Sequence, residues 1–284
     1  GLGGDRLEFQ TPHGLLMPSD FVTIEASQIV SRRVLMANRS SCLIALLCTL
    51  TSLNTVASAR AAGDYFEVME VTPSRVINHE VDLKGPFDDD LIKTLLTGPQ
   101  LFSHAVGSGE KAAQDRNAYL NWYQIAQPAT EPRRLLVIRD PLRGNKAHQI
   151  TIQNSAFLLS PAQRVTTGPP SPLPDGLDHF KAYKIVNATQ VSQQVKLAGT
   201  YGPADRTATK AAYLCVPVEQ RHHHDHFPVK NAQDCMLIYE LMPHEHKASV
   251  TTIDQFGLNK LDTHSGRWLS VPAEIVGPNS QDAK

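Results

Sequence analysis

The chain has 284 residues, of which 41% are hydrophobic and 19% charged, and its formal net charge is −1. This composition suits one or two globular domains with a sizeable core. The near-neutral charge, with no Lys/Arg run longer than two, argues against a nucleic-acid binder, which would carry a clustered basic face. No apolar run reaches the roughly 18 residues expected of a transmembrane helix.

The first recognisable element, residues 36–61, has the three parts of a secretory signal peptide. A positive region precedes a short apolar region and two small-residue cleavage sites: Arg32, Arg33 and Arg39, then Cys42–Leu50, then Ala57–Ala59 and Ala59–Ala61. We therefore expect a secreted or periplasmic protein and prefer this interpretation to a buried core helix. Leu47 precedes Cys48 where a lipid-modified cysteine would need a small residue, so free secretion is favoured over lipid anchoring. Residues 1–35 form an upstream extension, before the natural start at Met36, and we assign it no function.

Export changes the meaning of the cysteines, because only Cys215 and Cys235 remain after cleavage. Two cysteines 20 positions apart in an oxidising compartment favour a disulfide over two buried free thiols. Such a bridge would contribute on the order of 3 kcal/mol in the chain-entropy model.

The rest of the chain repeats one pattern four times. Each copy opens with an alternating strand: "YFEVMEV" from Tyr65, "YLNWYQI" from Tyr119, "HFKAYKI" from His179 and "CMLIYEL" from Cys235. One column of this alignment holds Met69, Tyr123, Tyr183 and Tyr239. Apolar residues at every second position predict a strand with one face in a core.

A second β-rich run follows in each copy, beside a turn, and its large residues align as Phe87, Leu142, Tyr201 and Phe256. A third strand closes the copy, with Leu101, Leu158, Leu214 and Leu269 in one column at spacings of 57, 56 and 55 residues. Proline ends the last three copies, and His104 stands at that position in the first. The sequence therefore predicts four divergent three-stranded repeats of about 56 residues.

These repeats predict an all-β fold in two halves. A Pro/Gly-rich linker at 166–176 separates residues 62–165 from residues 177–276, and 277–284 form a C-terminal tail. Two three-stranded units can pair, so we expect two six-stranded barrel- or sandwich-like halves. A four-bladed propeller is the alternative, although three strands are few for a blade.

Four motifs carry a family resemblance: "DHFKAYKI" at 178–185, "YLCVPVEQ" at 213–220, "DQFG" at 254–257 and "WLSVPAE" at 268–274. They resemble a family of secreted bacterial repeat proteins of unknown function with HFKCYK, LCVPVEK and DQFG-type motifs. The resemblance is clear over 178–274 and faint over 64–165. It implies an extracytoplasmic, disulfide-stapled, all-β module and brings no known activity.

Two family cysteines are absent, since Ala182 and Ser270 occupy their positions; their joint absence is expected if those positions normally pair. Cys215 matches the cysteine of the family's LCVP motif. Cys235 lies three residues before Ile238, where its partner would be expected, so the resemblance weakens the proposed bridge.

Histidines are the strongest candidates for chemistry. "RHHHDHF" at 221–227 connects the third and fourth repeats, and "MPHEHK" at 242–247 follows the strand from Cys235. In an extended chain His222, His224 and His226 would share one face, as would His244 and His246. Imidazoles so placed can bind Cu, Zn or Ni. The alternative is a solvated polar loop, which we favour because no third ligand has the spacing of a metal finger.

No catalytic motif is present: there is no G-x-S-x-G elbow, H-E-x-x-H helix or P-loop. Trp122 and Trp268 can be imagined as a carbohydrate platform, but both fall on repeat strands, which favours core packing. We therefore expect a binding or structural protein that requires no cofactor, with an extracellular ligand or surface component as partner. A metalloprotein or hydrolase that uses the histidine-rich loop is the alternative.

Overall fold

The computed structural model describes residues 63–128, 130–170, 172–174 and 176–278, so the predicted signal peptide and upstream extension lie outside the described residues. Apart from short 3₁₀ turns such as η2 (Pro141–Arg143), the regular structure is β, which confirms the all-β class. The strands are β1 Tyr65–Pro73, β2 Asn78–Lys84, β3 Ile92–Ser108, β4 Tyr119–Ile125, β5 Arg134–Arg139, β6 His148–Val165, β7 His179–Ile185, β8 Gln190–Gly199, β9 Gly202–His222, β10 Asp225–Phe227, β11 Cys235–Asp254 and β12 Gly257–Pro278. In the described part of the chain, no helix is both long enough and apolar enough to cross a membrane.

Each predicted repeat forms the expected unit, with β1–β3, β4–β6 and β7–β9 as repeats 1 to 3 and β11–β12 as repeat 4. In repeat 4 the first two strands run together as β11. The second strand of every repeat makes a hairpin with the beginning of the third, as β2 does with β3 and β5 with β6. The alternating apolar residues of these segments suit a pleated, half-buried surface, which is why they form strands.

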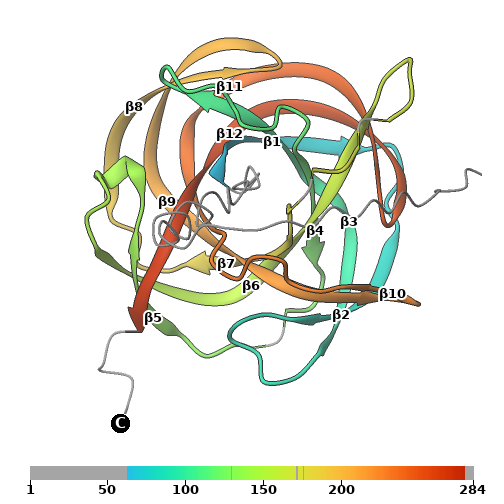
Figure 1. The fold of residues 1–284 in the computed structure, drawn as a ribbon, viewed down its shortest axis with the longest axis horizontal. Coiled ribbons are helices and arrows are strands. Elements are labelled where there is room, and N and C mark those ends of the chain that lie inside the picture. The colour runs from blue at the N-terminus through green and yellow to red at the C-terminus, as the bar shows by residue number, and fades with distance from the viewer. Residues whose placement is uncertain (1–62, 129, 171, 175, 279–284) are drawn as a thin grey trace, which may run out of the picture. The chain divides into compact units, whose positions relative to one another are not determined.

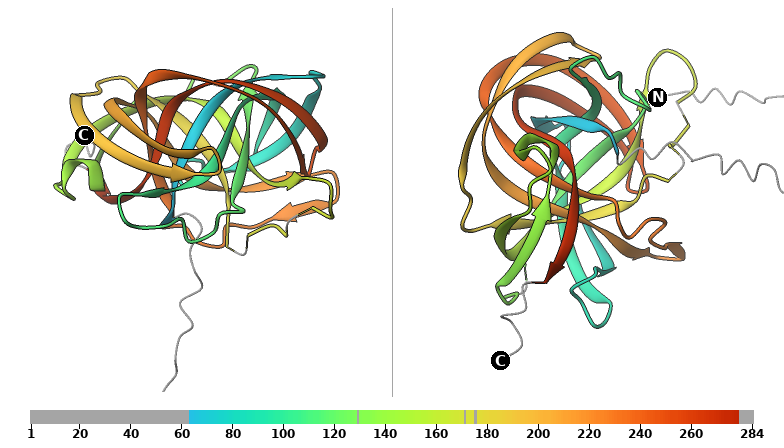
Figure 2. Two further views of the ribbon diagram at one scale, coloured as in Figure 1. Left: turned by 90° about the horizontal axis from the view of Figure 1, so that it is seen from above. Right: turned by 60° about the vertical axis from the view of Figure 1, so that its left-hand side comes forward.

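The first and third strands of all four repeats make one closed, antiparallel circuit. Followed in order, the pairs are β1–β12, β12–β11, β11–β9, β9–β7, β7–β6, β6–β4, β4–β3 and β3–β1. The circuit can be traced in Figure 1, and Figure 2 shows the long strands of the second half, in orange and red, curving around it. Repeat 4 thus closes directly onto repeat 1.

The hairpins add a second set of pairings that join opposite repeats. β2 of repeat 1 pairs with the end of β9 in repeat 3, and β8 of repeat 3 pairs with the end of β3 in repeat 1. Likewise β5 of repeat 2 pairs with β12, and the end of β11 in repeat 4 pairs with β6. Each hairpin therefore docks on the repeat two places along the chain.

This topology differs from two separate six-stranded halves and from a propeller. All twelve strands belong to one sheet, and its pairings cross the boundary between residues 62–165 and 177–276 in both directions. The linker between β6 and β7 contains no strand in its described residues, yet β6 and β7 pair directly. A proline-rich segment breaks a strand, but it does not prevent the flanking strands from pairing with each other.

The strand register also corrects the alignment of repeat 1 by one residue. Phe102, rather than Leu101, lies opposite Met69, just as Leu158, Leu214 and Leu269 lie opposite the aromatic residues of their repeats. The spacings become 56, 56 and 55 residues, and Ala105 instead of His104 takes the proline position. His104 therefore lies opposite Glu67 across the β1–β3 pair.

One face of the circuit encloses a core to which all four repeats contribute. Two columns of the alignment supply most of its side chains: Phe66, Leu120, Phe180 and Met236, then Val68, Trp122, Ala182 and Ile238. Trp122 is 1% exposed and Trp268 packs partly buried against this core, which confirms their interpretation as packing residues. A large apolar side chain buried in this way stabilises the fold by roughly 1.5–3 kcal/mol.

The opposite face of the circuit is covered by the hairpin turns. Phe87 of repeat 1 contacts Tyr183 of repeat 3 with ring centroids 5.4 Å apart, and Phe256 of repeat 4 contacts Tyr123 of repeat 2 at 4.7 Å. The corresponding residues Leu142 and Tyr201 pack against the clusters that contain Tyr239 and Met69, respectively. The aligned large residues thus share one role: each packs the turn of its repeat against the repeat two places away.

Candidate functional site

Polar side chains gather at these turn-on-strand contacts, two residues before the aromatic column. That position holds Glu67, Asn121, Lys181 and Leu237 in repeats 1 to 4. The turn of repeat 1 covers Lys181, and the turn of repeat 3 covers Glu67. These two contacts have equivalent places in the fold, but their chemistry differs.

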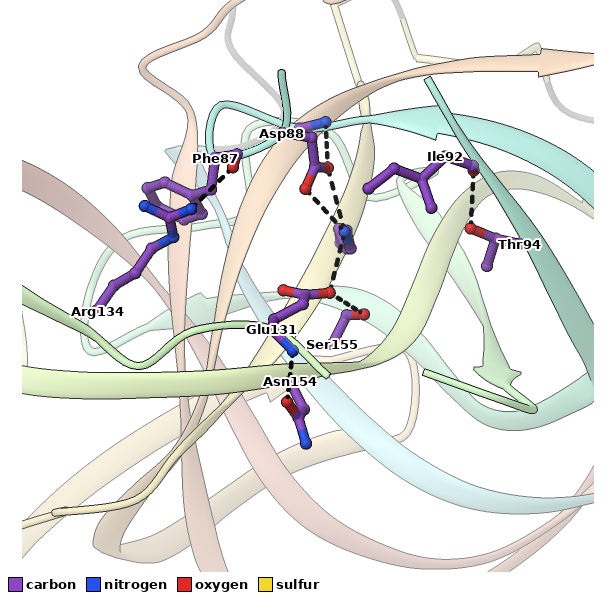
Figure 3. Close-up of polar contacts among 10 residues, drawn as sticks. Phe87, Asp88, Ile92, Thr94, Glu131, Arg134, Asn154 and Ser155 are labelled. Atoms are coloured by element: carbon purple, nitrogen blue, oxygen red, sulfur yellow. Dashed lines mark hydrogen bonds and ion pairs between the residues drawn. The ribbon is translucent and has the colours of Figure 1, made fainter. Parts of the chain in front are cut away.

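Lys181 forms a closed ion cluster, which we call the Lys181 network (Asp88, Glu131, Ser155 and Lys181; Figure 3). The Lys181 Nζ lies 3.1 Å from an Asp88 carboxylate oxygen and 3.2 Å from a Glu131 carboxylate oxygen. Ser155 donates a hydrogen bond of 2.7 Å to Glu131, and the backbone N–H of Gly85 donates one of 2.9 Å to Asp88. The side chains of Lys181 and Asp88 are only 4% and 6% exposed, and both carboxylates contact the ammonium group, so the network is closed.

Glu67 belongs instead to an open pocket of about 190 Å³, the Glu67 pocket, lined by Glu67, Tyr201, Gly202, Pro203, Ala204, Arg206, His244 and His246. The Glu67 carboxylate lies 3.6 Å from His104 Nε2 and 3.7 Å from Arg206 Nε. Tyr201 stands between two imidazoles, with its ring centroid 4.1 Å from that of His246 and 5.0 Å from that of His104.

Three nitrogen atoms near Glu67 are buried without a hydrogen-bond partner: His104 Nε2, behind the pocket, and Arg206 Nε and His246 Nε2, which belong to residues of its lining. Burial lowers the pKa of His104 to about 4, and the hydrogen bond with the Ala105 carbonyl only partly offsets it. The imidazole is therefore neutral at pH 7. Its Nδ1 contacts the carbonyl oxygen of Ala105 at 3.3 Å, and a carbonyl can only accept, so Nδ1 carries the proton and Nε2 the lone pair.

Two glycines leave the room that these side chains occupy. A Cβ at Gly199 would lie 2.9 Å from the His104 ring, and one at Gly266 would lie 2.7 Å from a Glu67 carboxylate oxygen. Asp140 and Asp254 stand at the position of Gly199 in repeats 2 and 4. Where the turn of repeat 4 covers the first strand of repeat 2, Asp254 accepts hydrogen bonds of 2.7 Å from both Tyr123 and Asn121. Small residues thus make space at the turn of repeat 3.

The predicted histidines at 244 and 246 reach the Glu67 pocket because β11 is irregular there. The β11–β12 register shifts between Glu240 and His244 and again between Glu245 and Ala248. Both His244 and His246 line the pocket, and the ring centroid of His246 lies 4.1 Å from that of Tyr201. The metal-binding role of this pair stays a prediction.

The "RHHHDHF" segment folds differently from the extended chain that we expected. A two-residue turn at His223 and His224 joins β9 to β10, with His223 at φ 55°. His222 pairs with Asp225, whereas His226 pairs with Arg221. The turn places His222 and His226 on opposite faces of the hairpin, because adjacent residues of a strand alternate. His226 contacts Glu219 at 3.0 Å, and His224 is exposed in the turn.

A residue that sequence reasoning missed joins this segment: His79 of β2. We call His79, His222 and His223 the histidine cluster. The ring centroid of His222 lies 4.2 Å from that of His223 and 6.1 Å from that of His79. Phe256 supports the cluster from below, stacked on His79 at 4.5 Å and in edge contact with His222 at 5.0 Å. All three histidines line a groove of about 380 Å³ that is separate from the Glu67 pocket.

Among the described residues, no group of three or more His, Cys, Asp or Glu side chains already has the arrangement of a metal site. The histidines of the two predicted segments also remain apart, since they line different cavities.

The predicted Cys215–Cys235 disulfide is not formed, and both cysteines are free and buried. Met236 lies opposite Cys215 in the β9–β11 pair, so Cys235 points to the other face of the sheet. Burial raises the pKa of both thiols, that of Cys235 to about 12. The positions of the two missing family cysteines do not face each other either, because Ala182 pairs with Cys215 and Ser270 with Ile238.

Comparison with known proteins identifies a repeat family. A model described as a repeat of unknown function (DUF7450) matches residues 119–272, slightly more than half of the chain. Neither curated proteins nor solved structures gave a match.

Proposed function

The chain belongs to this family of repeats of unknown function, and we propose that it is an extracytoplasmic binding protein whose ligand occupies the Glu67 pocket. The observation that carries the proposal is the contrast between two equivalent contacts. The Lys181 network is closed by short ion pairs, whereas Glu67 and Arg206 line an open cavity together with Tyr201 and His246. A ligand in this cavity can offer hydrogen-bond partners to the polar groups that border it.

The chemistry of the pocket indicates a neutral, hydroxyl-rich ligand of monosaccharide size. Arg206 and Glu67 carry opposite charges 3.7 Å apart, and His104 is neutral, so the pocket favours neither anions nor cations. Arg206 Nε is a donor and the Glu67 carboxylate an acceptor, and a hydroxyl group satisfies both. The Tyr201 and His246 rings, tilted by 50° to each other, offer an aromatic surface for the apolar face of a sugar ring. The volume is below the roughly 300–1,000 Å³ of pockets for drug-sized ligands.

The test is isothermal titration calorimetry of the purified protein against neutral monosaccharides, disaccharides and linear polyols, with hexuronic acids and amino sugars as charged probes. We expect saturable 1:1 binding of at least one neutral sugar or polyol. Arg206→Met and Glu67→Gln should each abolish it. Lys210→Ala, which removes an exposed ion pair with Glu240 from the same strand β9, serves as the matched control. Absence of binding across the neutral panel, or unchanged binding by Arg206→Met, would overturn the proposal.

Export by the segment 36–61 is a second part of the proposal. It is supported by the ordered positive, apolar and small-residue regions. Expression of the full chain in a bacterial host, followed by intact-mass analysis of the culture medium and the periplasm, tests it directly. A mature species that begins just after Ala59 or Ala61 is expected, and recovery of only the uncleaved chain from the cytoplasm would refute it.

A further inference from the structure

The histidine cluster lies outside the proposed ligand pocket, and its chemistry points elsewhere. Its members come from two repeats that are distant in sequence. β2 of repeat 1 pairs with the end of β9, with Asp82 opposite Arg221 and Leu83 opposite Gln220. The same register puts Val81 beside His222, and His79 lies on the face of Val81 because residues two apart in a strand share a face. The docking of repeat 1 on repeat 3 therefore brings His79 to His222.

We infer that His79, His222 and His223 form a binding site for one divalent transition-metal ion of the class Cu²⁺, Ni²⁺ or Zn²⁺. Imidazole nitrogen is the ligand that these ions share. With metal–nitrogen bonds of about 2.0–2.1 Å and a tetrahedral angle, two coordinated imidazoles have ring centroids about 5 Å apart. The observed separations of 4.2 and 6.1 Å lie on either side of that value.

Two charged neighbours of the cluster have partners of their own. The guanidinium of Arg221, which also lines the groove, is paired with Glu219 at 3.0 Å, and the carboxylate of Glu80 is paired with Lys93 at 2.8 Å. The three imidazoles of this groove therefore remain available to an incoming ion.

Two features make the cluster ready to accept an ion. No ring nitrogen of the three histidines makes a hydrogen bond to another described residue, in contrast to His226, which contacts Glu219. His79 and His222 are held from below by Phe256, while His223 occupies an exposed turn and is free to rotate. Two anchored ligands and one adjustable ligand suit a site that closes on metal binding.

The experiment is calorimetric titration of the purified full chain with Cu²⁺, Ni²⁺ and Zn²⁺ at pH 7.5, together with electron paramagnetic resonance of the Cu²⁺ complex. We expect one ion per chain for at least one metal, nitrogen hyperfine structure in the Cu²⁺ spectrum, and a higher Tm in its presence. His79→Ala and His222→Ala should each remove the stoichiometric binding. His226→Ala and His224→Ala are matched controls from the same hairpin and should leave it intact.

The His79→Ala variant distinguishes a folded metal site from an unstructured histidine-rich loop, because such a loop would bind metal without His79. Equal binding by the parent protein and His79→Ala, or loss of binding in His224→Ala and His226→Ala instead, would overturn the inference. His79→Gln, which keeps a polar side chain at the same place, separates a folding defect from loss of a ligand: the variant should keep its parent Tm without metal and lose the metal-dependent rise. The sugar titration is independent of this site, so either proposal can fail alone.

Discussion

The Lys181 network and the Glu67 pocket lie at equivalent positions of the same fold, yet one is sealed and the other is open. In both, the turn of one repeat covers the first strand of the repeat two places away. Asp88 and Glu131 close the first contact at 3.1 and 3.2 Å from Lys181, whereas the Glu67 carboxylate lies 3.6 Å from the neutral His104 and 3.7 Å from Arg206 and borders a cavity. Repetition therefore builds the framework, and divergence at a few polar positions decides which contact stabilises the fold and which receives a ligand.

The largest effect is expected from breaking the sealed contact. Lys181→Met leaves the Asp88 and Glu131 carboxylates buried without a cation, which should lower the free energy of unfolding by about 3–5 kcal/mol. Urea denaturation followed by circular dichroism measures it, with the exposed Lys184→Met on the same strand as control. Adding Asp88→Asn and Glu131→Gln should restore part of the loss. A Lys181→Met variant as stable as the parent would contradict the structural role of the network.

A covalent test of the framework uses the strand that carries Lys181. Ala182 lies directly opposite Cys215, and both belong to the inner core. Ala182→Cys should therefore form a disulfide with Cys215 under oxidising conditions and stabilise the chain by up to about 4 kcal/mol in the chain-entropy model. Mass spectrometry of the alkylated, non-reduced protein detects it, with Lys184→Cys, which lies on the same strand opposite Tyr213 instead of a cysteine, as the control. If Ala182→Cys remains reduced, the β7–β9 register is not as described.

The dependence of stability on pH distinguishes the two regions, because His104 lies beside Glu67 and the Lys181 network contains no histidine. His104 and His179 both have pKa values lowered to about 4 by burial, against 6.5 for the ordinary side chain. Between these values the unfolded chain binds more protons, so stability is complete above about pH 6.5 and falls as the pH drops towards 4. Each histidine should account for on the order of 3 kcal/mol. His104→Asn should remove about half of the loss between pH 7 and 4.5, measured by urea denaturation, and an unchanged pH profile would contradict the burial of His104.

The smallest effect on stability is expected at the open contact. Glu67→Gln should change the free energy of unfolding by less than about 1 kcal/mol, because the ion pair with Arg206 is long, His104 is neutral and the carboxylate borders the pocket. The same variant should lose sugar binding. A loss of stability as large as that of Lys181→Met would show that Glu67 holds the fold together in the same way as Lys181, and the distinction between the two regions would disappear.

Periodicity made much of the fold predictable. The alternation around Tyr123 and Tyr183 identified the first strands, and the aligned large residues Phe87 and Phe256 marked the turns. The arrangement of repeats was not predictable, because a linker such as 166–176 reveals a break in a strand and says nothing about which strands pair across it. The one-residue error in repeat 1 arose because Leu101 and Phe102 are both apolar, and only the pairing with Met69 distinguishes them.

The candidate site was only partly predictable. His222, His244 and His246 stand out by sequence, but His79, His104 and Arg206 are single residues whose importance depends on contacts between distant repeats. One signal was present: Glu67, Asn121 and Lys181 put polar groups into a column beside the aromatic residues. The predicted common face of His222 and His226 failed because two residues of the segment form a turn, which reverses the chain before the second histidine.

The most direct test of the central distinction follows side-chain imidazole nitrogens by ¹H–¹⁵N NMR while the sugar identified by calorimetry is added. The account predicts that the signals of His104, His244 and His246 at the Glu67 pocket move and saturate together, while those of buried His179 and the Lys181 ammonium stay fixed. Movement at Lys181 and His179 with no change at His104 and His246 would contradict it.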